Sequence, residues 1–303
     1  MEVLKGHHFV SDGSRLNGKK VAFTSPSQYA SRLQRFLEEE GAFAISCPSI
    51  SVRTTPENLE AVKNCFRRSS TLYSYPYSGI AFTSRSGIRA VADVLSANEN
   101  STTEVKGNSC PSQIFEDGFF VSALGKDAEL LYELDLFGVR TRKVRVIVPS
   151  IATPQAMVDE LGDGRGRCIL CPVPLVQGLE EPPVVPKFLE ALTAKGWQPQ
   201  RLNAYTTEWA GPQCATSLFP LTQLDALVFT STAEVEGLIK SLQILGITTI
   251  RTGAKPVLAA HGPVTAAGAK SLGIDIDVVS KNFSSFKGIV DALDLHWRYG
   301  DKQ

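Results

Sequence analysis

Apolar and polar positions alternate along the chain with two different periods. Short apolar runs, such as KKVAFTS at 19–25 and SGIAFTS at 78–84, predict strands, and a segment with the period of an amphipathic helix follows each of them. The same succession recurs from DALVFTS at 225–231 onward. Regular alternation of strand and helix predicts an α/β fold built on parallel sheets.

Further strands, a helix and two loops can be predicted from other segments. One strand is expected over 43–52 and another over 197–207, with a last helix near 285–297. The proline-rich stretch 172–186 predicts a loop, and the polar stretch 98–118 predicts a surface insertion with little internal structure.

The chain contains a weak internal repeat. The segment IAFTSRSGIRAVADVL (80–95) resembles LVFTSTAEVEGLIKSL (227–242), and 119–134 corresponds in the same way to 257–272. Each half therefore holds a strand with a Thr-Ser end, a helix, a second strand, a glycine and a second helix. This repeat predicts two similar α/β lobes in preference to one extended sheet.

Composition narrows the class of protein. The chain has 303 residues, 43% hydrophobic and 20% charged, which is typical of a globular protein with sizeable cores. The formal net charge is zero, so no general basic excess indicates nucleic acid as a partner. No apolar run reaches the ~18 residues of a membrane span, and the first residues do not read as a secretory signal. We expect a soluble protein of a reducing interior compartment.

The six cysteines are scattered, and only Cys168 and Cys171 form a CxxC. A zinc ribbon would need a second such pair, and in a strand the two side chains would point to opposite faces. A structural role is therefore favoured over a metal or redox site, which stays as the alternative. We expect no metal and no cofactor.

Hydroxyl residues gather where the predicted strands end, at Thr24–Ser25, Thr83–Ser84, Thr230–Ser231 and Thr265. In open α/β sheets ligands bind beyond the carboxyl ends of the strands, where free helix amides favour anions. The alternative is that these residues are ordinary helix N-caps. His261 borders the glycine turn, and a local hydrogen-bonding role is favoured for it over lining the ligand cleft.

Before the helix near 265, Gly262 is expected to permit a tight turn and close backbone approach, and Pro263 suits a first helical turn. The motifs GxSxG and HExxH and the Walker loop do not occur in the sequence. A reaction driven by positioning, or a binding function, fits this sequence better than metal catalysis.

Several of these segments together resemble the uroporphyrinogen-III synthase family. HGPVTAAGAKSLGIDIDVV is similar to the family's Gly-x-x-Thr-Ala segment, and GWQPQRLNAYTTEWAG to its strand with Tyr-x-Thr near the end. The units FTSRSGIRAV and LVFTSTAEVEGL resemble its two strand–Ser–helix units. The resemblance covers about 20–298 with a gap at the insertion, and it rests on the order of these short motifs.

The resemblance implies two similar flavodoxin- or Rossmann-like lobes joined by a two-strand hinge near 50–54 and 203–207. Lobe 1 would comprise 1–53 with 207–303, and lobe 2 would be the inserted 54–206. It also implies a cofactor-free lyase of tetrapyrrole biosynthesis, a monomer whose substrate is hydroxymethylbilane. The substrate loses water and closes to uroporphyrinogen III with its last ring inverted.

The resemblance also implies roles for single residues. Tyr205 matches the tyrosine thought to aid departure of the hydroxyl, with a structural tyrosine as the alternative. Substrate binding is assigned to Thr265, Ser231, Ser84, Gly262 and Gly125. Two further residues mark a departure, because many members carry arginine where this chain has Ser25, and Arg85 is the candidate to replace that charge.

Two other functions stay open from the sequence. A paralogue would keep the lobes and bind a tetrapyrrole or other polyanion without turnover, which Ser25 favours; an unrelated two-lobed metabolite-binding protein is the third hypothesis. No nucleic-acid or membrane partner is expected. The resemblance fits a cytoplasmic protein, or a plastid-stromal one if the source is a plant or alga.

Overall fold

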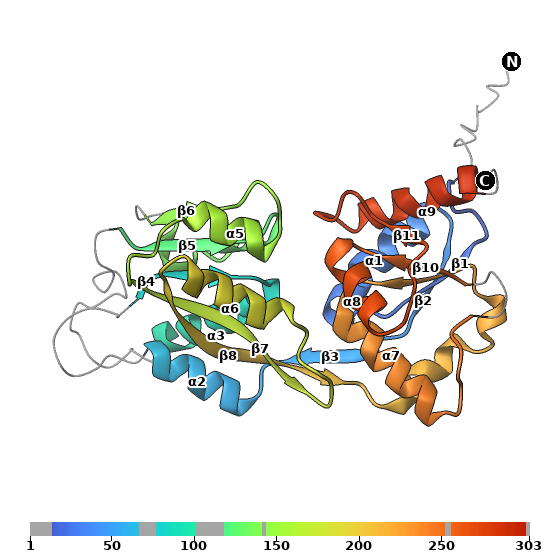
Figure 1. Ribbon diagram of the computed structural model, residues 1–303, viewed down its shortest axis with the longest axis horizontal. Coiled ribbons are helices and arrows are strands. Elements are labelled where there is room, and N and C mark those ends of the chain that lie inside the picture. Colours follow the sequence, from blue (N-terminus) through green and yellow to red (C-terminus); the bar gives the residue numbers. More distant parts are fainter. Residues whose placement is uncertain (1–13, 67–76, 101–117, 141–143, 252–255, 301–303) are drawn as a thin grey trace, which may run out of the picture. The chain divides into compact units, whose positions relative to one another are not determined.

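The computed structural model describes residues 14–66, 77–100, 118–140, 144–251 and 256–300. The chain divides into two compact units: unit 1 is Met1–Ile50 with Ala210–Gln303, and unit 2 is Ser51–Trp209. Each unit holds one mostly parallel sheet between layers of helices, which confirms the expected α/β fold (Figure 1). The expected two-strand hinge stays a prediction.

Within the described residues, the sheet of unit 1 has five strands in the order β11-β10-β9-β1-β2, and all neighbours are parallel. The strands are β1 (Lys20–Phe23), β2 (Phe43–Ser46), β9 (Ala226–Phe229), β10 (Val257–Ala260) and β11 (Val278–Val279). The helices are α1 (Ser27–Glu39), α7 (Thr232–Ile244), α8 (Pro263–Ser271) and α9 (Lys287–Tyr299), with the 3-10 helices η3 (Pro212–Leu218) and η4 (Leu221–Gln223).

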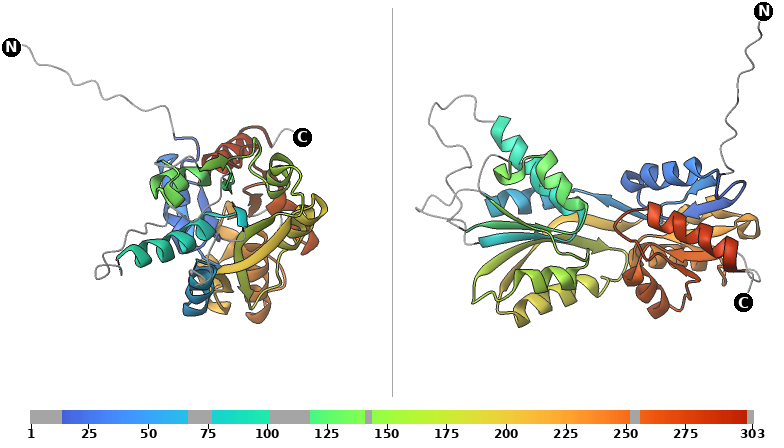
Figure 2. Two further views of the ribbon diagram at one scale, coloured as in Figure 1. Left: turned by 90° about the vertical axis from the view of Figure 1, so that its left-hand side faces the viewer. Right: turned by 90° about the horizontal axis from the view of Figure 1, so that it is seen from above.

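Alternation along these strands explains the layers of unit 1. Val21 and Phe23 of β1 pack in one apolar core with α1 and α9, whereas Ala22 packs in the other core with α7 and α8. Figure 2 shows helices on both faces of this sheet.

The sheet of unit 2 has six strands within the described chain, in the order β3-β8-β7-β4-β5-β6. The strands are β3 (Ile50–Arg53), β4 (Tyr77–Phe82), β5 (Phe120–Ala123), β6 (Arg145–Ile147), β7 (Cys168–Gln177) and β8 (Gln198–Trp209). The helices α2 (Pro56–Phe66), α3 (Arg85–Asn100) and α4 (Asp127–Glu133), with η2 (Leu136–Gly138), share one core. The other core belongs to α5 (Pro154–Leu161) and α6 (Val184–Ala194).

The internal repeat corresponds to equivalent parts of the two sheets. From β4 the chain passes through α3 to the neighbouring strand β5 and on to β6, and from β9 it passes through α7 to β10 and on to β11. On the opposite side, β4 is paired with β7 and β9 with β1. The strand order therefore reverses between β4 and β7 and between β9 and β1, and such points are where open α/β sheets bind ligands.

Two expectations were wrong in detail. The single strand expected over 43–52 is two strands, because β2 pairs with β1 in one sheet and β3 lies beside β8 in the other. The loop expected over 172–186 is occupied through Gln177 by β7. Beyond Leu170, β7 is paired only with β8 among the described strands, so the missing amide hydrogens of Pro172 and Pro174 can face the unpaired side.

The predicted insertion is only partly visible. Helix α3 continues to Asn100, and 101–117 lies outside the described residues, as do His7, His8 and Cys110. A search of the described helices found none with the length and apolar content of a membrane span.

Candidate functional site at the strand ends

In unit 1, the ends of β1 and β9 bring four hydroxyl residues together at the point where the strand order reverses. Thr24 and Ser25 follow β1 and are both fully buried. Thr230 and Ser231 follow β9, and the hydroxyl oxygens of Thr230 and Ser25 lie 3.3 Å apart. Because Ser25 is 0% exposed, it could contact a ligand only if the surrounding chain moved.

Glu234 fills the centre of this group, and the sequence analysis missed it. Its side chain is 1% exposed. Oε2 accepts hydrogen bonds from the Thr230 amide at 2.8 Å and the Thr24 hydroxyl at 2.9 Å. Oε1 accepts from the hydroxyls of Thr230 and Ser231. The Ser-x-x-Glu spacing of a helix capping box was the available signal.

Ser231 is the N-cap of α7, since its side chain accepts a hydrogen bond from the Glu234 amide. Burial raises the pKa of the Glu234 carboxyl, and the hydrogen bonds from Thr230, Thr24 and Ser231 partly oppose that rise. The N-cap alternative is therefore confirmed for Ser231, and its hydroxyl is engaged within unit 1.

The next strand end carries Gly262 and Thr265. Thr265 is 6% exposed, and its hydroxyl donates to the Thr230 carbonyl at 3.1 Å. The tight turn expected at Gly262 is wrong, because its φ of -164° and ψ of 174° are extended values that any residue adopts. The close approach expected at Gly262 is present and favours glycine, since a Cβ there would lie 3.1 Å from the Cβ of Phe283.

Helix α8 begins without a side-chain cap. Its N-cap is Gly262, which has no side chain to accept a hydrogen bond from the first-turn amides. Pro263 takes the first helical position, as expected. The amides of Val264 and Thr265 belong to the first turn, where an α-helix supplies no partner. Val264 is 48% exposed. This helix start is therefore suited to an acidic group.

His261 follows the end of β10, and its imidazole ring lies against neighbouring residues of unit 1. Its ring packs edge-on against Phe286 at a centroid distance of 5.0 Å, and its Nδ1 is buried without a hydrogen-bond partner in the described chain. Burial lowers the pKa of His261 to about 4, while a hydrogen bond with the Phe283 main chain opposes this shift. The imidazole is therefore neutral near physiological pH.

In unit 2, the corresponding strand end joins Ser84 to Tyr205. The Ser84 Oγ and Tyr205 Oη lie 2.8 Å apart, and Ser84 Oγ also accepts the Gly87 amide at 3.2 Å. Tyr205 lies on β8 and is 6% exposed. Two predicted site residues from distant segments of the sequence are thus in direct contact.

Arg85 and Gly125 occupy neighbouring strand ends of unit 2. Arg85 is 20% exposed and lies 3.8 Å from Asp127 and 3.7 Å from Glu133, so acidic groups of α4 partly balance its charge. Gly125 has a φ of +49°, and a Cβ there would lie 3.0 Å from the Cβ of Ala152. Both its conformation and its surroundings favour glycine.

The predicted site residues divide between the two units. Unit 1 contains Ser25, Ser231, Gly262 and Thr265. Ser25 and Thr265 are hydrogen-bonded to Thr230, Ser231 follows Thr230 in the chain, and Gly262 is the N-cap of the helix that holds Thr265. Unit 2 contains Ser84, Arg85, Gly125 and Tyr205.

The CxxC thiols have separate surroundings. Cys168 donates to the Gln198 side chain at 3.3 Å, whereas Cys171 is fully buried in an apolar core. Burial raises the pKa of Cys171 to about 12. This arrangement supports the structural interpretation.

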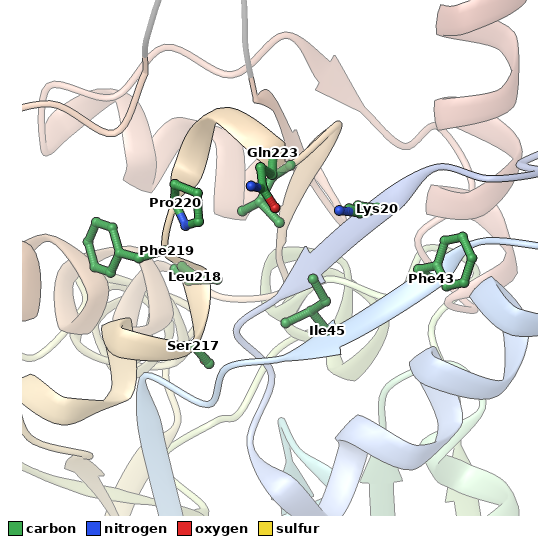
Figure 3. Close-up of a pocket in the computed structure, with 9 residues that line it drawn as sticks. Lys20, Phe43, Ile45, Ser217, Leu218, Phe219, Pro220 and Gln223 are labelled. Carbon is green, nitrogen blue, oxygen red and sulfur yellow. The ribbon is translucent and has the colours of Figure 1, made fainter.

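A pocket of about 190 Å³ lies elsewhere in unit 1. It is lined by Lys20, Phe43 and Ile45 of β1 and β2 and by residues 217–220, 223 and 224 (Figure 3). Lys20 is the first residue of β1, so this pocket is not at the carboxyl ends of the strands. We therefore do not assign it to the candidate site.

Comparisons with known proteins identify relatives. The sequence model described as uroporphyrinogen-III synthase HemD matches residues 139–289. A mutant uroporphyrinogen III synthase from the extremely thermophilic bacterium Thermus thermophilus is 18% identical, with a TM-score of 0.53 over 91% of this chain and 99% of that one. The synthetase from Helicobacter pylori is 13% identical, with a TM-score of 0.45 over 91% and 99%. A search of curated protein sequences found no match.

Proposed function

This chain belongs to the uroporphyrinogen-III synthase family, and we propose that it closes hydroxymethylbilane to uroporphyrinogen III, with loss of water and inversion of the last ring. Family membership supports a role in tetrapyrrole biosynthesis. The observation that best supports this specific reaction is the Ser84–Tyr205 contact, because it places a tyrosine hydroxyl at the end of β4, where a ligand would bind in this fold.

Recognition of the substrate is assigned to helix starts. Hydroxymethylbilane carries several carboxylates, which need hydrogen-bond donors and positive potential. In unit 1, we assign carboxylate binding to the first turn of α8, which contains the amides of Val264 and Thr265 and has no side-chain cap. In unit 2, Arg85 lies at the start of α3 and keeps part of its side chain exposed.

Chemistry at the departing hydroxyl is assigned to Tyr205. Ser84 Oγ accepts the Gly87 amide, so the serine proton can be donated to the Tyr205 oxygen. In that arrangement the phenol proton is not used by Ser84, and Tyr205 can donate it toward the leaving oxygen. Positioning supplies the rest, since ring closure without inversion competes and the protein has to hold one geometry.

The test is an isomer assay. Purified protein is given hydroxymethylbilane, the product is oxidised, and the type I and type III porphyrins are separated. We expect type III in clear excess, whereas heat-denatured protein gives the spontaneous type I isomer. Product formed only as type I would reject the synthase.

The second candidate function is a paralogue that binds a tetrapyrrole without turnover. The fully buried Ser25 favours it, because many family members carry an arginine at this position. Binding of uroporphyrin with no type III product would identify this case.

A further inference from the structure

The carboxyl group of Glu234 occupies the place where an α/β unit would receive an anionic ligand. It lies at the first turn of α7, between the ends of β1 and β9, where the strand order reverses. Its four hydrogen bonds use the Thr230 amide and the hydroxyls of Thr24, Thr230 and Ser231. The donors at this position are therefore taken by the chain itself.

The equivalent position in unit 2 has no carboxyl group. Gly87 of the first repeat aligns with Glu234 of the second. A Cβ at Gly87 would lie 3.0 Å from the Pro172 carbonyl oxygen, so the β7 main chain fills the space. The serine there, Ser84, contacts the phenol of Tyr205 and the Gly87 amide. The carboxyl group is thus a specific feature of unit 1.

The contacts of Glu234 extend to the start of α8. Thr230 gives both its amide and its hydroxyl to Glu234, which fixes the orientation of its peptide. The Thr230 carbonyl in turn accepts the Thr265 hydroxyl at 3.1 Å. Glu234 therefore acts on Thr265 through Thr230, across the ends of β9 and β10.

We propose that Glu234 is a positioning residue. Its carboxyl group occupies the start of α7, so that no substrate carboxylate binds there, and it holds Thr230 so that the start of α8 is oriented to bind a substrate carboxylate. This inference rests on the proposed function for the identity of the acidic ligand. It assigns binding of the ligand's acidic groups in unit 1 to the start of α8. The Ser231 hydroxyl then serves as a hydrogen-bond donor to Glu234 and not to the ligand.

The first experiment replaces Glu234 by alanine and adds acetate as a substitute carboxyl group. Glu234→Ala leaves buried donors unsatisfied, so we expect the Tm to fall by roughly 5–10 °C. Sodium acetate should restore at least half of that loss, and sodium chloride at equal ionic strength should not. Leu238→Ala is the control, because it opens a cavity on the same helix within an apolar core and should not respond to acetate. Equal acetate effects on both variants would overturn the built-in carboxyl group.

The second experiment measures binding of uroporphyrin, an octacarboxylic porphyrin, by fluorescence. We expect Glu234→Ala to raise the Kd for uroporphyrin about tenfold and acetate to return it toward the wild-type value. A purely structural role of Glu234 would not require acetate to change the Kd. Glu234→Gln fills the same space, so its smaller loss of affinity should be insensitive to acetate. Tighter binding by Glu234→Ala would overturn the proposal, because the α7 start would then be an open ligand site.

These outcomes separate the inference from the proposed function. A wild type that binds uroporphyrin but makes no type III isomer rejects the synthase and leaves the role of Glu234 standing. A wild type that does not bind uroporphyrin overturns the positioning role, whatever the Tm shows. Recovery of the Tm by acetate without recovery of the Kd would make Glu234 structural only.

Discussion

At the scale of single residues, hydroxyl groups in this protein differ by the partner that each one meets. Ser231 is tied to a buried carboxyl group, Thr265 to a main-chain carbonyl, and Ser84 to a phenol. The carbonyl has no proton to donate, and the Glu234 carboxyl is 1% exposed and already holds four hydrogen bonds within unit 1, whereas a phenol is a group suited to proton transfer. The residue with the clearest chemical role is therefore Tyr205.

Tyr205→Phe tests that role. Loss of one hydroxyl should lower kcat by about 100-fold or more, in the range of a general acid–base group. The free energy of unfolding should change by about 1 kcal/mol for loss of the hydrogen bond with Ser84. Isomer-resolved kinetics and urea denaturation measure the two effects.

Ser84→Ala is the matched control, since it removes the same hydrogen bond but keeps the phenol. Its kcat should fall much less than that of Tyr205→Phe. An unchanged rate for Tyr205→Phe would show that this tyrosine has a structural role alone.

At the scale of elements, the starts of α3, α7 and α8 determine what each strand end can bind. Helix α7 is capped by Ser231 and closed by Glu234, α3 follows Ser84, and α8 has Gly262 without a side-chain cap. The position of α8 depends on its packing against α7. That contact involves Gly268, where a Cβ would lie 2.0 Å from Thr232 Oγ1 and 2.7 Å from Thr232 Cβ.

Gly268→Ala should therefore destabilise the protein. Alanine favours a helix by about 1 kcal/mol, but forcing α8 away from α7 costs about 1–3 kcal/mol. We expect a net loss of about 1 kcal/mol in urea denaturation. The double variant with Thr232→Ala, which removes two of the crowding atoms, should recover part of it. A Gly268→Ala protein more stable than wild type would contradict the close packing of these helices.

At the scale of the whole molecule, the chain leaves unit 1 once and returns to it once. Unit 2 is one continuous segment, Ser51–Trp209, of a size typical of a domain. The two segments of unit 1 are joined beside this insertion, because the Ala210 amide donates to the Ser49 carbonyl at 3.1 Å. Each unit also has its own pair of apolar cores.

Residues 51–209 expressed alone should therefore fold. We expect circular dichroism of a mixed α/β protein and a single cooperative thermal transition, because both apolar cores of unit 2 are complete within this segment. A shorter segment that ends at Trp197 lacks β8, which lies between β3 and β7, and should not fold. An unfolded 51–209 segment would show that unit 2 depends on the rest of the chain.

Local pattern was sufficient for much of this protein. Apolar periodicity predicted the strands and helices, and the repeat predicted two similar units, because burial on a strand or helix leaves a regular mark in the sequence. Short family motifs predicted the contact partners Ser84 and Tyr205 as site residues. Pro263 was also placed correctly at the first turn of its helix.

Tertiary structure alone decided the features that depend on distant neighbours. The run at 43–53 divides between two sheets, and the prolines of β7 are tolerated because of where β4 stops pairing. The sequence predicted a close approach at Gly262, and the tertiary structure decided that its partner is Phe283. Glu234 was not predicted as a site residue; it is buried, and one of its donors is Thr24, more than 200 residues earlier in the sequence. Apart from the Ser-x-x-Glu spacing at the start of α7, hydrogen-bond partners and close approaches between remote segments leave no local or periodic signal, so the sequence could not identify the partners.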